Sequence, residues 1–167
     1  MAFGFPDKRA CGARAMYVRS ARSAIASVGG IGSLPRGPAT AASIAGALTL
    51  RALRPGIVAH AALLACAVYA GQVCANELAH ADDPDPQRIV IDELAGVWLA
   101  FLGIRMTTAR CLIGTGLFRA LDKLKPGPIG LVDRMDSRWS VMGDDLVAGA
   151  LANLVLRAWI AGVDSAR

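Results

Sequence analysis

Hydrophobic residues along the chain gather into five long stretches separated by polar connectors. The stretches cover residues 38–53, 56–75, 89–104, 108–121 and 146–163. Ala and Leu dominate them and β-branched residues are a minority, which favours helix over strand. Pro38 suits a helix start, whereas Pro55 and Pro126 suit breaks. The pattern therefore predicts an all-α fold, a compact bundle of about five main helices.

The length of these stretches bears on where the bundle resides. The second has the roughly 20 residues that a helix needs to cross about 30 Å of hydrocarbon. The third and fourth are shorter, so they would need tilt or partial immersion. Hydrophobic residues make up 54% of the chain but aromatic residues only 5%, and small residues let membrane helices approach closely. We expect a membrane-embedded or membrane-associated bundle, with a compact Ala-rich soluble domain as the alternative.

Charge is distributed unevenly along the chain. The net charge is +5, yet most of the 13 acidic residues lie between Glu77 and Asp145, and basic residues load the first segment. If five helices alternate in direction, the connectors at 76–88 and 122–144 meet at one end, which therefore becomes acidic. The positive-inside rule places that end and the basic tail in the cytoplasm. The exceptions at the other end are Arg51, Arg54, Arg105 and Arg110.

Several function classes are disfavoured. The basic tail lacks interleaved aromatic residues and any reader motif, so we expect no nucleic-acid partner. The four cysteines and two histidines have no metal-finger spacing, which argues for free thiols and against a zinc site. No removable signal peptide is evident. The predicted organisation is a basic tail over residues 1–28, a helical domain over 29–163 and a C-terminal tail over 164–167, and the sequence does not indicate an oligomeric state.

Three acidic segments are candidates for chemistry. In IVIDELAGVW, Asp92 and Glu93 open an apolar helix, where a carboxylate near the membrane centre would cost at least about 2.5–3.5 kcal/mol. Gly96 lies one turn further on, so another backbone could pack against this acidic face. The alternative is a pair of interfacial acids that only cap the helix.

The other two segments combine acids with nearby cations. In FRALDKLKPGP, Arg119, Asp122 and Lys125 follow one another at intervals of three and share a helix side, as phosphate and metal ligands or as a salt-bridge ladder. In MGDDLVAG, Asp144 and Asp145 repel each other unless a cation lies nearby; N-capping is the alternative. Mg²⁺ takes one or two carboxylates plus water and phosphate oxygens.

A Gly- and Ser-containing loop, GIGSLPRGPATAAS, leads into the first predicted helix. Such a loop can present backbone N–H groups to an anion at the helix N-terminus. We take Ser33, Arg36 and Thr40 from it as candidate substrate-binding residues.

These segments resemble a known family. DPQRIVIDELAGVW, FRALDKLKPGPI and VMGDDLVAGALANL are similar in order and content to the blocks of the phosphatidylglycerophosphatase A family, and the Gly/Ser loop resembles its N-terminal motif. The chain has Ala39, Ala42 and Ser140 where that family usually has glycine. The resemblance implies an α-helical membrane enzyme that uses Mg²⁺ to remove the terminal phosphate of phosphatidylglycerophosphate. The implied site residues are Asp92, Glu93, Arg119, Asp122, Lys125, Asp144 and Asp145.

The residues and the resemblance together give one functional expectation. We expect Mg²⁺-assisted hydrolysis of a lipid phosphate by a multi-pass protein of the bacterial cytoplasmic (inner) membrane, with its site facing the cytoplasm. The expected Mg²⁺ ligands are Asp92, Glu93, Asp122, Asp144 and Asp145. The expected catalytic residues are Asp92, Glu93, Asp122 and Asp145, with Arg119 and Lys125 on the phosphate. A covalent aspartyl-phosphate stays open, as do two rival functions: cation or proton movement by intramembrane carboxylates, and a soluble helical phosphatase.

Overall fold

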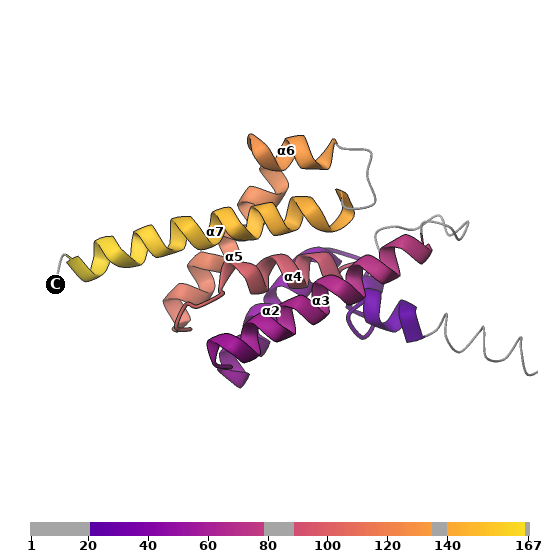
Figure 1. Cartoon of the computed structure of the whole chain (residues 1–167), viewed down its shortest axis with the longest axis horizontal. Helices are drawn as coiled ribbons and strands as arrows, with labels where there is room; N and C mark the ends of the chain where they lie inside the picture. Colours follow the sequence, from indigo (N-terminus) through magenta and orange to yellow (C-terminus); the bar gives the residue numbers. More distant parts are fainter. Residues whose placement is uncertain (1–20, 79–88, 135–139, 166–167) are drawn as a thin grey trace, which may run out of the picture.

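A computed structural model describes residues 21–78, 89–134 and 140–165, and every regular element within these ranges is a helix (Figure 1). The elements are η1 (Ile31–Ser33), α2 (Pro38–Leu53), α3 (Ile57–Leu78), α4 (Ile91–Ala100), α5 (Thr108–Leu124), α6 (Pro128–Asp133) and α7 (Ser140–Ser165). The all-α prediction is confirmed, and the five predicted stretches correspond to α2, α3, α4, α5 and α7. Residues 1–20 of the predicted basic tail and residues 166–167 lie outside the described ranges, so the domain boundaries stay predictions.

Local chemistry sets most of the helix ends. Pro38 is the first residue of α2, where its missing N–H costs nothing. The Thr107 side chain caps α5 by accepting a hydrogen bond from the Arg110 backbone N–H at 3.2 Å. α7 begins at Ser140, more than a turn before the predicted start. Asp144 and Asp145 therefore lie inside α7, and the alternative that they cap its N-terminus is wrong.

α4 is the central helix and packs on α2, α3, α5 and α7. The Trp98 indole Nε1 donates to the Gly46 carbonyl oxygen of α2 at 3.1 Å, and His60 Nε2 of α3 lies 2.9 Å from the Trp98 carbonyl oxygen. Phe101 and Phe118 are completely buried beside it. These contacts fix both the depth and the rotation of α4 within the bundle.

The closest helix pair is α4 and α7, which approach at two glycines. A Cβ atom added to Gly149 would lie 3.2 Å from Gly96 Cα and closer still to the Gly96 carbonyl oxygen. A Cβ atom added to Gly96 would lie 2.8 Å from the Asp145 carbonyl oxygen. Glycine is therefore required at this crossing because the two backbones occupy the space of a side chain.

Polar side chains of α7 hold the C-terminal end of α4, which is shorter than the predicted stretch. Asn153 Nδ2 donates to the carbonyl oxygens of Leu99, Ala100 and Leu102 at 2.9–3.2 Å. The Arg157 guanidinium donates to the Leu102 carbonyl oxygen at 2.8 Å and to Asn153 Oδ1 at 2.7 Å. The carbonyl groups left unpaired where the helix ends are thus satisfied inside the protein.

The helices run between two ends of the bundle. We call the acidic end the one where α4 and α7 begin and α5 ends, and the arginine end the one where α2 and α4 end and α3 and α5 begin. The 17 residues of α5 connect them, a rise of about 25 Å. The C-terminus lies toward the arginine end (Figure 1). This arrangement agrees with the predicted alternation of connectors.

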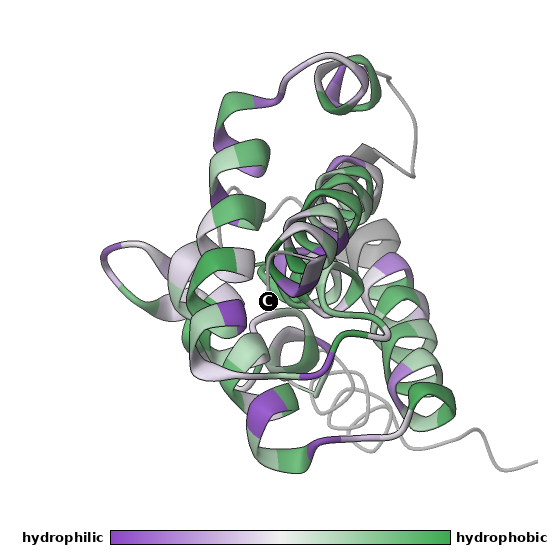
Figure 2. Cartoon of the chain, turned by 90° about the vertical axis from the view of Figure 1, so that its left-hand side faces the viewer, coloured by the Kyte–Doolittle hydropathy of each residue, from purple (hydrophilic) through white to green (hydrophobic). Residues whose placement is uncertain are grey.

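Within the described residues, two helices are long and apolar enough to cross a membrane: residues Ile57–Cys74 of α3 and Met142–Ser165 of α7, each with a mean hydropathy of 1.8. Only 28% and 22% of these windows are buried within the chain. A core helix of a soluble protein would be mostly buried, whereas here large apolar side chains such as Val58 and Leu154 are exposed. Hydrophobic residues cover most of the helix ribbons in Figure 2.

The glycine crossing gives a test of the fold. We expect Gly149→Ala to destabilise the protein by about 1–3 kcal/mol, because the methyl group would push α4 and α7 apart. Gly162→Ala in the same helix is the matched control, since nothing lies within 4 Å of its added Cβ, and alanine is the better helix former by up to about 1 kcal/mol. Thermal unfolding of the detergent-solubilised protein measures both changes. Equal melting temperatures for the two variants would contradict the crossing.

Candidate active site

A cavity of about 320 Å³ opens at the acidic end between the starts of α4 and α7 and the end of α5. Its lining residues are Asp92, Glu93, Asp122, Lys125, Asp133, Asp144 and Asp145. Six of these seven side chains are carboxylates. The structure thus brings together the candidate residues of three separate sequence segments.

Three of the carboxylates form the inner cluster, namely Asp92, Glu93 and Asp145. One oxygen from each lies within 4.8 Å of the others. The α4–α7 crossing explains this position, because Asp92 and Asp145 each lie four residues, one helical turn, before a crossing glycine. Both helices begin at the acidic end, so the first turn of α4 and the second turn of α7 place these side chains side by side.

The inner cluster has acceptor oxygens and lacks enough donors. Asp145 is only 4% exposed. Among the described residues, Glu93 Oε2 and Asp145 Oδ1 are buried and have no hydrogen-bond partner. Asp92 Oδ1 accepts from the neighbouring Glu93 backbone N–H, at 3.0 Å. Buried oxygens of this kind require a cation or a proton.

Electrostatics agree with that requirement. Asp92 lies in the first turn of α4, outside the two candidate membrane-spanning helices α3 and α7. Burial, followed by the side-chain hydrogen bond and charge of Glu93 and the charge of Asp145, raises the pKa of the Asp92 carboxyl well above its usual value, whereas the hydrogen bond from the Glu93 backbone N–H opposes this shift. A hard divalent cation would remove this mutual repulsion, and oxygen-only donors suit Mg²⁺. The residues present therefore fit a magnesium ion.

Two cations of the predicted site, Arg119 and Lys125, are each paired with a carboxylate outside the inner cluster. Arg119 Nη1 lies 2.8 Å from Asp122 Oδ2, and both side chains are less than a fifth exposed. The Arg119 Nε–H group is buried and has no hydrogen-bond partner among the described residues. Arg119 does not line the cavity itself but holds Asp122, a carboxylate that does.

Lys125 connects α5 to α6 and α7. It is the C-cap of α5 in a left-handed conformation, with φ of 44°, which turns the chain away from the helix. Its Nζ donates to Asp133 and, at 2.8 Å, to Asp144 Oδ2. Burial opposes the charge of Lys125, but the hydrogen bonds and attraction of Asp133 and Asp144 outweigh it, so the pKa of this ammonium group is raised. Lys125 therefore stays a cation throughout the working pH range.

The structure separates the other candidates. Ser33, Arg36 and Thr40 are exposed and do not line the acidic cavity, so their predicted contact with substrate stays a prediction. Asp133 does line it, although sequence reasoning did not select this residue as part of the site. The signal lay in its place within the Pro- and Gly-containing connector between two selected segments.

Comparisons with known proteins find similar sequences over most of the chain. The family model described as phosphatidylglycerophosphatase A matches residues 24–160. The chain is also 30% identical over 107 residues to a protein of Bacteroides thetaiotaomicron that is named, provisionally, a phosphatidylinositol-3-phosphatase. That match covers 61% of this chain and 67% of the relative. No solved structure matches the chain significantly.

The unpaired inner cluster predicts a stability effect in the absence of divalent cations. We expect Asp145→Asn to increase the free energy of unfolding by about 1 kcal/mol and so to raise the melting temperature. The amide removes one buried charge and can donate to a neighbouring carboxylate. Asp164→Asn is the matched control, since Asp164 is exposed at the far end of the same helix. Thermal unfolding in EDTA measures both. A lower melting temperature for Asp145→Asn would contradict the idea of an unpaired cluster.

Proposed function

Because the chain belongs to the phosphatidylglycerophosphatase A family, which its family model shows over residues 24–160, we propose that it hydrolyses the phosphomonoester of phosphatidylglycerophosphate. The products are phosphatidylglycerol and inorganic phosphate. The observation that carries the proposal is the inner cluster, where three carboxylates from two helices converge within 4.8 Å and two of their oxygens lack partners.

Asp92, Glu93 and Asp145 would hold Mg²⁺, with Asp122 and Asp144 at the border of the site. When bound, the ion would neutralise phosphate charge and make the attacking water more acidic. Such help is needed because hydrolysis of phosphate monoesters is among the slowest uncatalysed reactions.

The residues of the chain have separate tasks in this proposal. Lys125, which lines the cavity, would supply a fixed positive charge to the phosphate. Arg119 does not line the cavity, but its buried Nε–H group has no hydrogen-bond partner among the described residues, so it would donate to a phosphate oxygen. A water oxygen bonds to phosphorus while the bond to the glycerol oxygen breaks. A carboxylate of the site takes the proton of the water and passes it to the departing glycerol oxygen. The alternative of a covalent phosphate on an aspartate uses the same carboxylates.

We place the acidic end at the cytoplasmic surface of the bacterial inner membrane, with α3 and α7 spanning the bilayer. Their length, hydropathy and low burial support this arrangement. The basic residues of the first 28 positions support the orientation through the positive-inside rule. The acyl chains of the substrate would then lie along the exposed apolar helix faces while the headgroup enters the cavity.

A second lipid phosphate is a candidate substrate because of the name of the Bacteroides relative. A phosphatidylinositol 3-phosphate carries its monoester on a ring, which is bulkier than the glycerol of phosphatidylglycerophosphate. Cation or proton movement fits less well, since Arg119 and Lys125, paired with Asp122 and Asp144, favour a ligand that carries phosphate over a naked cation.

The first test concerns the metal and the carboxylates. We expect the purified protein to release phosphate from phosphatidylglycerophosphate with Mg²⁺ and to lose this activity in EDTA. Asp145→Asn should lower kcat at least about 100-fold, since it removes an inner-cluster ligand, whereas Asp164→Asn should retain activity. Wild-type rates in EDTA would exclude the metal, and wild-type rates for Asp145→Asn would exclude the inner cluster.

The second test concerns the substrate. We expect kcat/KM to be at least about tenfold higher for phosphatidylglycerophosphate than for phosphatidylinositol 3-phosphate, a difference of about 1.4 kcal/mol in transition-state binding. Phosphate release from both lipids in the same neutral detergent gives the ratio. The reverse order would assign the chain the activity for which its relative is named.

A further inference from the structure

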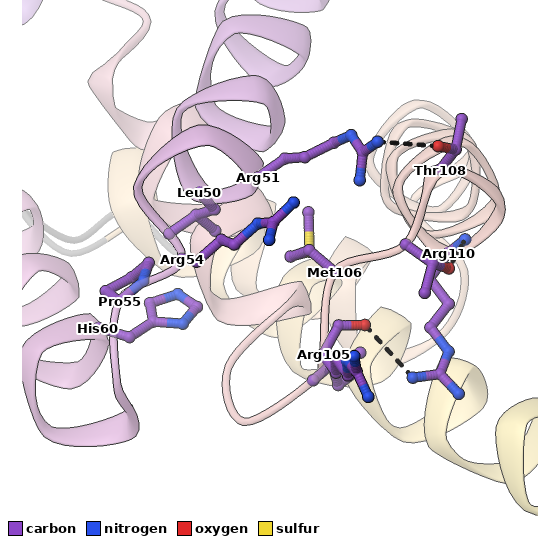
Figure 3. Close-up of a pocket in the computed structure, with 11 residues that line it drawn as sticks. Leu50, Arg51, Arg54, Pro55, His60, Arg105, Met106, Thr108 and Arg110 are labelled. Carbon is purple, nitrogen blue, oxygen red and sulfur yellow. Dashed lines mark hydrogen bonds between the residues drawn. The ribbon is translucent and has the colours of Figure 1, made fainter.

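A second and larger cavity, of about 690 Å³, lies at the arginine end. The end of α2, the start of α3, the α4–α5 connector and the start of α5 surround it. Four arginines line it: Arg51, Arg54, Arg105 and Arg110. In Figure 3 the side chains of Arg51 and Arg54 enter from α2, and those of Arg105 and Arg110 lie on the opposite side, past Met106.

The four guanidinium groups have little compensation within the described part of the chain. Arg51 donates to the Thr108 hydroxyl at 3.0 Å, and Arg110 donates to the Arg105 carbonyl oxygen at 3.3 Å. The guanidinium groups of Arg54 and Arg105 form no hydrogen bond or ion pair with the described residues. Asp164 lines a smaller adjoining cavity with Arg105, Arg110 and Arg157.

This concentration of cations runs against the charge pattern of the rest of the chain. These same arginines are the exceptions to the positive-inside rule under the proposed orientation. They come from two connectors that are about 50 residues apart in sequence, and the fold places them around one concave surface. Like charges there repel one another unless an anion lies between them. Single arginines that only anchor helix ends at a membrane surface have no need to converge.

The surroundings indicate what kind of anion the cavity suits. Guanidinium groups match phosphate oxygens in pairs. The N-terminus of α5, beside Thr107 and Thr108, adds the positive end of a helix dipole to the lining. Leu53, Ile57 and Val58 are exposed at the neighbouring turn, so apolar chains could lie next to the opening. Basic pockets between membrane helices bind phospholipid headgroups in this way.

We propose that the arginine cavity is a phosphate-binding site, separate from the acidic cavity, for a phosphate group carried by an anionic phospholipid or free in solution. The two cavities share no lining residue. About 25 Å of helix α5 separates them. The proposal therefore stands whether or not the acidic end hydrolyses a lipid phosphate.

The test compares two doubly substituted full-length proteins in neutral detergent and EDTA. In one, Arg54→Gln is combined with Arg105→Gln, which removes the two unpartnered guanidinium groups and leaves the hydrogen bonds of Arg51 and Arg110 in place. In the other, Lys123→Gln is combined with Arg134→Gln, which changes the charge equally at exposed positions of the acidic end. Melting temperatures establish that each variant is folded. If the double arginine variant is not folded, the single Arg54→Gln and Arg105→Gln proteins replace it.

Binding is measured with three probes: phosphatidylglycerol and phosphatidylcholine by native mass spectrometry, and inorganic phosphate by calorimetry. We expect phosphatidylglycerol to bind about tenfold more weakly to the arginine variant than to wild type and the control. If inorganic phosphate neither binds nor competes, the source is a lipid headgroup. If inorganic phosphate binds wild type and is lost in the arginine variant, the source is free phosphate. The proposal would be overturned if phosphatidylglycerol and inorganic phosphate each bound equally well to wild type and both variants. It would also be overturned if phosphatidylcholine bound as tightly as phosphatidylglycerol and inorganic phosphate did not bind.

Discussion

The close approach of α4 and α7 at Gly96 and Gly149 is the constraint on which the rest of the structure depends. Two backbones that touch leave no room for adjustment by side chains, so the depth and register of one helix fix those of the other. The acids lie one turn before the crossing, and the Asn153 contacts lie beyond it. A single contact without side chains therefore determines both the convergence of the carboxylates and the capped end of α4.

The crossing creates an electrostatic cost that the neighbouring helices only partly offset. Arg119 and Lys125 neutralise outer carboxylates, Asp122 and Asp144, through direct ion pairs. Within the described residues, neither cation forms an ion pair with the inner cluster, where buried oxygens stay unpartnered. The five carboxylates expected to share one task are thus of two kinds. The outer ones hold cations in place, and the inner ones have open acceptor sites that a magnesium ion would fill.

Much of this arrangement could be predicted from local sequence. Composition and prolines predict the helices, and α2 has the predicted bounds. The alternation of helix direction predicts which connectors meet at one end. Gly96, beside two acids, predicts that another helix packs closely there. What could not be predicted depends on tertiary geometry. The left-handed turn at Lys125 sends its ammonium to Asp133 and Asp144 rather than along α5 to Asp122. Asn153 and Arg157 read as polar interruptions of an apolar helix, and only the position of the α4 end explains them.

The same geometry explains why charge is segregated along the bundle. Helices that alternate in direction bring connectors from distant parts of the sequence to a common end, so a modest bias in each connector becomes a strong local field. At one end carboxylates converge, and at the other arginines do. The positive-inside rule depends only on the number of basic residues on each side of the membrane, whereas a binding site depends on where charged side chains converge. Arginines that lie against this rule are therefore more informative than those that follow it, because a specific contact must compensate for their charge.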